Sequence, residues 1–170
     1  LENNTLVAVL NETPVKEGDA FFLETGTVHA IGGGVLLAEI QQTSDITYRL
    51  YDWDRVDANG VGRELHTDFA LDAINFEPTN TKLDYEDIKN KSVNLVECPF
   101  FKTNILQISE KYNWKKTKES FTVFMCTEGS FTFNMLHFKA EFKKGDTILI
   151  PAIIDSFDII GEASLLEITI

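Results

Sequence analysis

The sequence has few cysteines, few basic residues and no long apolar run. Its two cysteines cannot form a disulfide framework and lack the CxxC spacing of a metal site, so a reducing, cytoplasmic location is expected. No 18-residue apolar run and no basic-then-apolar leader is present, so we expect neither a membrane-spanning helix nor a secretion signal. Lys and Arg number 15 against 27 Asp and Glu, and the net charge of −12 argues against nucleic acid or an anionic membrane as a partner.

The sequence does contain enough apolar material for a packed core. Apolar residues make up 44% of the 170 residues and include 13 Phe, which suits one ordinary domain or two small ones. Leu1 is not an initiator methionine, and we therefore expect a fragment of a longer protein. The composition indicates a globular chain and leaves its oligomeric state open.

Short apolar runs separated by turn residues predict strands in the first half of the chain. The expected strands cover residues 5–10, 20–23, 35–42 and 43–53. The polar stretch 54–65 is predicted as a loop whose tightest turn is Asn59-Gly60. A short helix is predicted over 66–76, with Thr67 as its N-cap.

The second half shows strand patterns at closer spacing. Expected strands cover residues 93–98, 100–109, 120–129, 130–135, 137–142, 146–152, 156–160 and 164–170. Short strands at this spacing with glycine or charged turns favour an antiparallel barrel or sandwich. We predict an all-β fold with a first domain over 1–78, a linker over 79–92 and a smaller domain over 93–170.

Two stretches of the chain echo each other. Residues 17–39 and 144–167 both begin with a glycine–aspartate turn, continue with an apolar strand and end near a glutamate. At matching positions the first copy has His29 and the second has Ser156. We infer two copies of one β-rich unit, of which only the first carries a metal-ligand residue type.

Residues 17–55 bring together a histidine, carboxylates and an arginine. His29 follows a tight turn and is interpreted either as a metal ligand or as a structural histidine. Asp45 and Arg49 share one strand face about 13 Å apart, so they line one pocket or form a solvated polar face. Glu39 lies among apolar residues, where a carboxylate must be paired, ligated or at an edge that reaches water.

Basic residues are scarce in the first half of the chain, which gives those present more weight. Arg49, Arg55 and Arg63 fall close together and are interpreted either as a local anion site or as surface ion pairs with nearby aspartates. The triple glycine 32–34 lacks the spacing of a phosphate-binding loop and is predicted to form a tight turn.

The run GDAFFLETGTVHAIGGG, followed by Glu39 and then SDITYRLYDWDR, resembles a known family. It is similar to the bacterial short form of type I mannose-6-phosphate isomerase, closely over about the first 75 residues. The resemblance implies cupin (jelly-roll) barrels: a first, incomplete catalytic barrel and a smaller metal-free second one. Glu24 stands where cupins often have proline, a departure that affects the turn more than the chemistry.

The resemblance also implies a metal site and its residues. In that family one zinc ion is held by a glutamine, a histidine, a glutamate and a later histidine, and His29 matches the last of these. The other ligands are expected upstream of Leu1. Arg49 matches the catalytic arginine, Glu39 and Asp45 match acidic residues that line the pocket, and Arg55 stands where a basic, substrate-binding residue occurs.

The implied reaction interconverts mannose 6-phosphate and fructose 6-phosphate by proton transfer through an enediol, with a hexose 6-phosphate as substrate. The general base stays unassigned. By itself the chain is expected to bind zinc weakly and to be inactive, because one histidine does not make a tetrahedral site. A non-catalytic sugar-binding or regulatory cupin module is the alternative; a cupin dioxygenase is disfavoured because the chain has no His-x-His.

Overall fold

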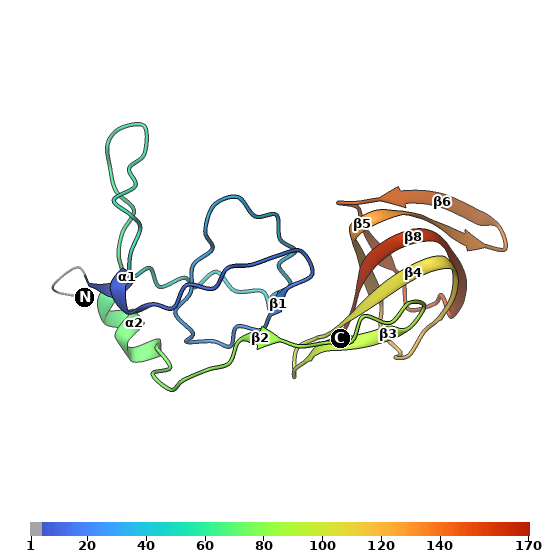
Figure 1. Ribbon diagram of the computed structural model, residues 1–170, viewed down its shortest axis with the longest axis horizontal. Coiled ribbons are helices and arrows are strands. Elements are labelled where there is room, and N and C mark those ends of the chain that lie inside the picture. Colours follow the sequence, from blue (N-terminus) through green and yellow to red (C-terminus); the bar gives the residue numbers. More distant parts are fainter. Residues whose placement is uncertain (1–4) are drawn as a thin grey trace. The chain divides into compact units, whose positions relative to one another are not determined.

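The computed structural model describes residues 5–170, which divide into two units. The first unit comprises the described residues up to Leu36 together with Thr43–Lys82. The second comprises Leu37–Gln42 and Leu83–Ile170 and contains the large sheet (Figure 1). Within residues 5–170, no helix has the length and apolar character needed to cross a membrane.

Regular structure in the first unit is short and sparse. Its helices and strands are α1 (Leu6–Val9), β1 (Ala20–Phe21) and α2 (Thr67–Ala73), and the unit ends at the first residue of β2 (Lys82–Leu83). Strands β1 and β2 pair with each other, and the Phe22 N–H donates to the Thr81 carbonyl at 2.8 Å beside them. Lys82 also forms an ion pair with Asp19 at 2.9 Å. The rest of the unit is loops and turns (Figure 1).

Three of the strands predicted in the first half are wrong. Residues 5–10 contain the short helix α1, and residues 35–42 and 43–53 carry no strand. A strand needs a neighbour that takes up its backbone hydrogen bonds, and the described chain offers these segments none. Their apolar side chains are correspondingly exposed: Leu36 is 88% exposed and Ile46 is 65% exposed. Of the predicted strand 20–23, residues 20 and 21 form β1.

The predicted turn and helix of the first unit are both present. Gly60 donates its N–H to the Asp57 carbonyl at 3.0 Å, which closes the turn at Asn59-Gly60, and a bridge joins Val56 to Gly62. Helix α2 lies within the predicted range. The predicted N-cap is wrong: Thr67 is the first helical residue, and the N-cap position is His66, which makes no side-chain capping bond.

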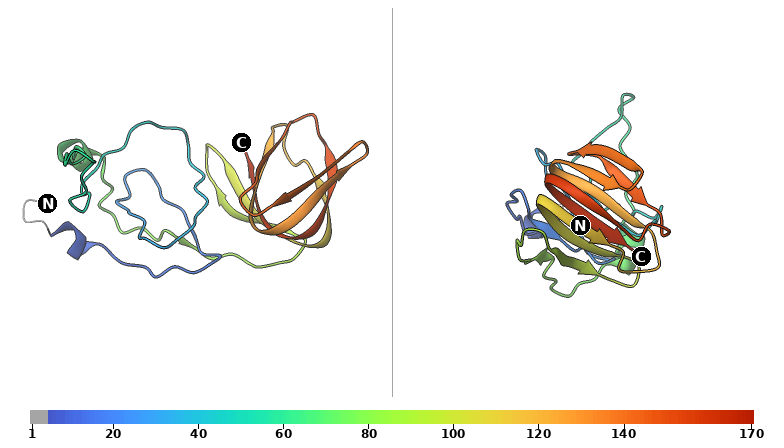
Figure 2. Two further views of the ribbon diagram at one scale, coloured as in Figure 1. Left: turned by 90° about the horizontal axis from the view of Figure 1, so that it is seen from above. Right: turned by 90° about the vertical axis from the view of Figure 1, so that its right-hand side faces the viewer.

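The second unit is an antiparallel sheet with six strands. They are β3 (Ser92–Glu97), β4 (Lys102–Lys115), β5 (Thr122–Met135), β6 (Phe138–Lys143), β7 (Thr147–Ile150) and β8 (Ser156–Thr169). Their order is β3-β4-β8-β5-β6, with β7 paired to β5 off this path. The sheet curls strongly (Figure 2). Since β3 and β6 do not pair with each other, the sheet over the described residues is not a closed barrel.

Gly129 and Gly161, which lie at or just beyond the ends of predicted strands, lie inside the long strands β5 and β8. Residues 120–135 were predicted as two strands and form one, β5, with a bulge between Cys126 and Glu128; β8 likewise replaces two predicted strands. Gly129 has φ +77, and a Cβ there would lie 2.0 Å from the carbonyl oxygen of Glu162. These glycines therefore allow two strands to approach closely and do not end them.

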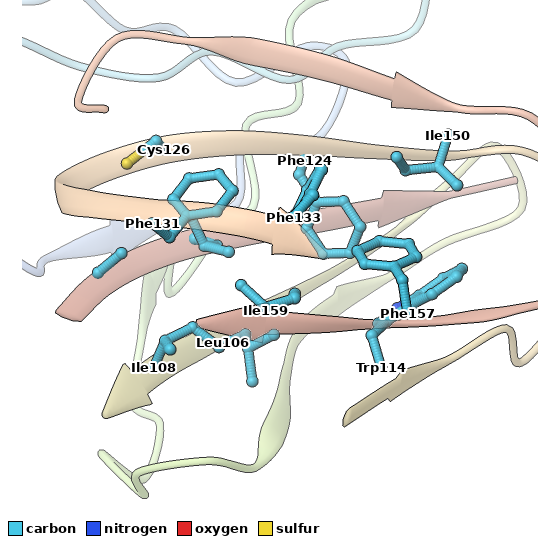
Figure 3. Close-up of a cluster of buried hydrophobic side chains, with 12 residues drawn as sticks. Leu106, Ile108, Trp114, Phe124, Cys126, Phe131, Phe133, Ile150, Phe157 and Ile159 are labelled. Carbon is cyan, nitrogen blue, oxygen red and sulfur yellow. The ribbon is translucent and has the colours of Figure 1, made fainter. Parts of the chain in front are cut away.

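An aromatic cluster fills the inside of the curled sheet (Figure 3). The ring centroids of Trp114 and Phe157 are 4.8 Å apart, and those of Phe133 and Phe157 are 4.6 Å apart. Alternate residues of β4, β5 and β8 supply this cluster because side chains alternate between the two faces of a strand. The expected all-β cupin class is confirmed by this unit, with a short helix, α2, preceding it.

Candidate functional site

Helix α2 is bonded at both ends to the segments that carry the predicted site residues. At its start, His66 N–H donates to the Arg49 carbonyl at 2.8 Å. Just beyond its end, Asn75 N–H donates to the Gly26 carbonyl at 3.0 Å. Gly26 has φ +90, and a Cβ there would lie 2.6 Å from the carbonyl oxygen of Ala73, so only glycine fits the turn before the predicted ligand. One helix thus links both segments.

His29 lies on the exposed end of that turn. Its Nδ1 is 2.8 Å from the Thr27 carbonyl oxygen. A carbonyl oxygen only accepts, so Nδ1 must carry the hydrogen and donate. In the neutral ring Nε2 then holds the lone pair, which is the form of histidine that binds a metal. The backbone of the turn therefore selects the tautomer that a metal ligand requires.

Arg49 is half-buried and fixed by hydrogen bonds along its length. Its backbone N–H donates to Nδ1 of His66 at 3.2 Å, and its Nη1 donates to the Glu64 carbonyl at 3.1 Å. A guanidinium has five N–H donors in a planar fork, so the bond to Glu64 orients the group and leaves further donors for an anion. This geometry suits recognition of a phosphate or a developing oxyanion.

The remaining predicted site residues are exposed. Asp45 and Arg55 belong to the first unit with His29 and Arg49, whereas Glu39 belongs to the second. The guanidinium carbon of Arg55 lies 5.4 Å from the centroid of the Trp53 ring, a cation–π contact. Within residues 5–170, no hydrogen bond or ion pair joins the side chains of His29 and Arg49.

Of the two interpretations of the clustered arginines, ion pairing with a nearby aspartate is the one that Arg63 follows, in a part-buried pair with Asp52. Nε of Arg63 donates to Asp52 Oδ2 at 2.7 Å, and its Nη2 donates to Oδ1, so the pairing is bidentate. The hydrogen bonds from Arg63 hold the pKa of the Asp52 carboxyl below its ordinary value, against the opposing effect of desolvation. The turn at Asn59-Gly60 was a usable signal, because a hairpin there brings residues 52 and 63 together. Nε and Nη2 of Arg63 are therefore occupied by Asp52.

His66 is a residue that sequence reasoning missed. Its Nδ1 accepts from the Arg49 N–H, and its own N–H donates to the Arg49 carbonyl. Its ring centroid lies 6.3 Å from that of Tyr48. The two partners are far apart in sequence, and no motif connects them. Only the fold places this imidazole beside the candidate catalytic arginine.

The donor set of the described residues fits one ligand of a zinc site. Nε2 of His29 is the lone-pair donor that zinc takes from histidine. Among residues 5–170, however, no group of three or more His, Cys, Asp and Glu residues is placed to hold a metal ion. The residues present therefore do not form a complete metal site.

The second unit has an aromatic core where its sequence echoes the first. Ser156 is exposed, and the adjacent Phe157 packs on Trp114. Glu167, the counterpart of Glu39, is only 4% exposed and accepts hydrogen bonds from three side chains. The donors are Trp114 Nε1 at 2.6 Å, Asn104 Nδ2 at 3.0 Å and Ser92 Oγ at 2.5 Å. These neutral donors satisfy a buried carboxylate, so this end of the core is a structural network.

Comparison with known proteins identifies the family. Residues 91–170 match the family model described as mannose-6-phosphate isomerase, cupin domain. Mannose-6-phosphate isomerase ManA of Bacillus subtilis is 37% identical over 158 residues, which are 91% of this chain and 50% of that relative. The chain belongs to the mannose-6-phosphate isomerase family. It spans about half the length of the curated relatives it matches.

Solved structures of mannose-6-phosphate isomerases resemble this chain in fold. A Bacillus subtilis mannose 6-phosphate isomerase matches with a TM-score of 0.66 at 31% identity, over 75% of this chain and 41% of that one. A Salmonella typhimurium mannose 6-phosphate isomerase bound to its substrate, fructose 6-phosphate, and a zinc atom matches with a TM-score of 0.53 at 12% identity. That match covers 64% of this chain and 28% of the Salmonella chain and shows the shared fold alone.

Proposed function

We propose that this chain is the C-terminal part of a zinc-dependent mannose-6-phosphate isomerase, which interconverts mannose 6-phosphate and fructose 6-phosphate through an enediol. The observation that carries the proposal is the 37% identity to ManA over 91% of this chain. The Salmonella isomerase that contains fructose 6-phosphate and zinc supports the choice of substrate and metal. The hydrogen-bonded placement of Arg49 and the tautomer of His29 supply the matching chemistry.

In this proposal His29 is the zinc ligand that the chain contributes. Its Nδ1–H is occupied by the Thr27 carbonyl, which fixes the ring and leaves Nε2 to coordinate. The other ligands come from the part of the protein that the chain does not span. Zinc, when bound, supplies a Lewis acid that polarises oxygens of the sugar.

Arg49 stabilises negative charge in the proposed reaction. Moving a proton between adjacent carbons of a sugar places charge on an oxygen, and a fixed guanidinium lowers the cost of that charge. The bond from Nη1 to the Glu64 carbonyl holds the group in place before substrate arrives. Arg55, with its cation–π contact to Trp53, is assigned to binding the substrate phosphate, and Glu39 and Asp45 to ordering the pocket.

We also propose the domain organisation and the location of the protein. Residues 1–78 form part of the catalytic barrel, 79–92 a linker and 93–170 a metal-free cupin domain, which the family match over 91–170 supports. A cytoplasmic location is supported by Cys98 and Cys126, which are both free thiols.

The alternative is a non-catalytic sugar-binding or regulatory cupin module. The incomplete donor set among the described residues favours it. It predicts that the complete reading frame has no Gln-x-His pair and no further glutamate ligand before the present Leu1. The sequence upstream of this chain therefore separates the two functions.

The decisive experiment measures conversion of mannose 6-phosphate by the full-length protein and by its Arg49→Ala variant. We expect the variant to lose turnover by about 10²- to 10³-fold, the loss typical when a group that stabilises an oxyanion is removed. Zinc content should stay at the wild-type level because Arg49 is not a ligand. Lys139→Ala, which removes an exposed charge on β6, serves as the control and should leave turnover unchanged. Near-normal turnover of Arg49→Ala would remove this arginine from the mechanism, and an inactive wild-type protein would overturn the isomerase assignment.

A further inference from the structure

The strongest unassigned feature of the site is the pair of reciprocal hydrogen bonds between His66 and Arg49. The Arg49 N–H donates to His66 Nδ1 at 3.2 Å, and the His66 N–H donates to the Arg49 carbonyl at 2.8 Å. One of these bonds uses the imidazole ring itself. The backbone N–H and carbonyl of Arg49, which a neighbouring strand would bond in a sheet, are thus both bonded by His66.

This contact fixes the protonation state of the His66 ring. A backbone N–H only donates, so Nδ1 must hold a lone pair and, in the neutral ring, Nε2 carries the hydrogen. A doubly protonated imidazolium could not accept this bond. His66 is thus held in the opposite tautomer to His29, whose Nδ1 donates to the Thr27 carbonyl. The two histidines of the first unit consequently have different chemistry.

Neighbouring groups hold the His66 ring in this position. The Tyr48 ring neighbours two others: its centroid is 6.3 Å from that of His66 and 5.7 Å from that of Phe69, with which it stacks. Nε2 of His66 lies 3.9 Å from Oε2 of Glu64, the residue whose carbonyl accepts from Nη1 of Arg49. The imidazole is 26% exposed as a side chain, so packing restricts it. Backbone and guanidinium of Arg49 are therefore both fixed by the segment Glu64–His66.

We propose that His66 is a positioning residue that aims Arg49 into the site by accepting its backbone hydrogen at Nδ1. The inference rests on the proposed isomerase function and adds a residue to it. A shift of the Arg49 backbone would also shift its guanidinium. A misplacement of about 1 Å in a catalytic group can lower the rate by about 10²-fold. His66 acts through Arg49 and does not itself react.

A matched set of substitutions in the full-length protein tests this role. Asn places its Oδ1 where histidine has Nδ1, whereas Gln places its acceptor farther out, near Nε2. His66→Asn should keep kcat for mannose 6-phosphate within about threefold of wild type. His66→Gln and His66→Ala should lower kcat by about 10- to 100-fold, with zinc content unchanged. Because His66 is also the N-cap position of α2, where Asn is favoured, the free energy of unfolding is measured for each variant. A purely structural role predicts that kcat falls only in variants that are partly unfolded at the assay temperature, whereas positioning predicts the loss in fully folded His66→Gln.

A second measurement reports on the contact without turnover. In protein labelled with ¹⁵N-arginine, the Arg49 amide proton should shift upfield in His66→Gln and His66→Ala and stay near its wild-type position in His66→Asn. Equal kcat in His66→Gln and wild type, or an equal loss in His66→Asn and His66→Ala, would overturn the positioning role while the isomerase assignment stands. An inactive wild-type protein would instead overturn the proposed function, and the positioning role with it.

Discussion

Glu39 and Glu167 end two similar stretches of sequence, yet they lie in different kinds of structure. Glu167 is on strand β8, 4% exposed, and accepts from Ser92, Asn104 and Trp114. Glu39 is exposed in a segment without strand structure. The comparison teaches that an apolar run specifies a strand only together with neighbours. β8 lies between β4 and β5, whereas the segment around Glu39 has no pairing strand among the described residues.

The largest expected effect comes from removing the buried glutamate. Glu167→Ala should lower the free energy of unfolding by on the order of 4 kcal/mol, because three donors lose their acceptor in a place that water does not reach. Glu39→Ala, the matched change in the other copy, should alter it by less than about 0.5 kcal/mol. Urea denaturation of both variants measures the difference. Equal losses would mean that the two copies do not differ in the way the structure indicates.

A smaller effect is expected from adding one methyl group between strands. Gly129→Ala should cost on the order of 3 kcal/mol, since the new Cβ would lie 2.0 Å from the Glu162 carbonyl oxygen and φ is +77. Gly145→Ala has a similar φ of +93 with nothing within 4 Å, so it isolates backbone strain at about 1 kcal/mol. Gly32→Ala, in open space in the first unit, should be nearly neutral. We expect the denaturation midpoint to fall most for Gly129→Ala, less for Gly145→Ala and least for Gly32→Ala. A loss for Gly129→Ala no larger than that for Gly145→Ala would contradict the close approach of the two strands.

The smallest effect concerns the ion pair that stabilises the first unit. Because Arg63 lowers the pKa of the folded Asp52 carboxyl, the pair contributes stability above the ordinary aspartate pKa of about 3.9 and loses it as pH falls through the lower folded value. The difference in thermal midpoint between wild type and Asp52→Asn should therefore be present at pH 6 and shrink below about pH 4. Asp54→Asn, at an exposed neighbour, is the control and should show a much smaller difference. A difference in thermal midpoint between wild type and Asp52→Asn that persists below about pH 4 would contradict a stabilising role for the Asp52–Arg63 ion pair.

Much of the second unit could be predicted from sequence because its strands find partners within the same stretch of chain. Closely spaced strand patterns predicted strands within β4, β5 and β8, and all three share one core. The errors lay at Gly129 and Gly161, which look like turn residues in the sequence. Their role depends on how closely another strand approaches, and no local pattern carries that information.

The candidate site was less predictable, for a different physical reason. His29 and Arg49 were found through a family resemblance, but their chemistry depends on which backbone atoms their nitrogens meet. The Thr27 carbonyl sets the tautomer of His29, and the ring of His66 bonds the Arg49 amide. Hydrogen bonds of this kind leave no periodic trace in a sequence. The Asp52–Arg63 pair, by contrast, follows from the hairpin between its members.

The short helix α2 acts as a spacer between the two halves of the candidate site. One of its ends is bonded to Arg49 and the other to Gly26, three positions before His29. The helix has seven residues, which at about 1.5 Å each give a length of about 10 Å, and it lies between His66 and Asn75, the residues that make those two bonds. A single residue inserted into the helix would lengthen it by about 1.5 Å and rotate one attachment by about 100°. If His29 and Arg49 act together as proposed, such an insertion should disturb the site as strongly as a substitution of either residue.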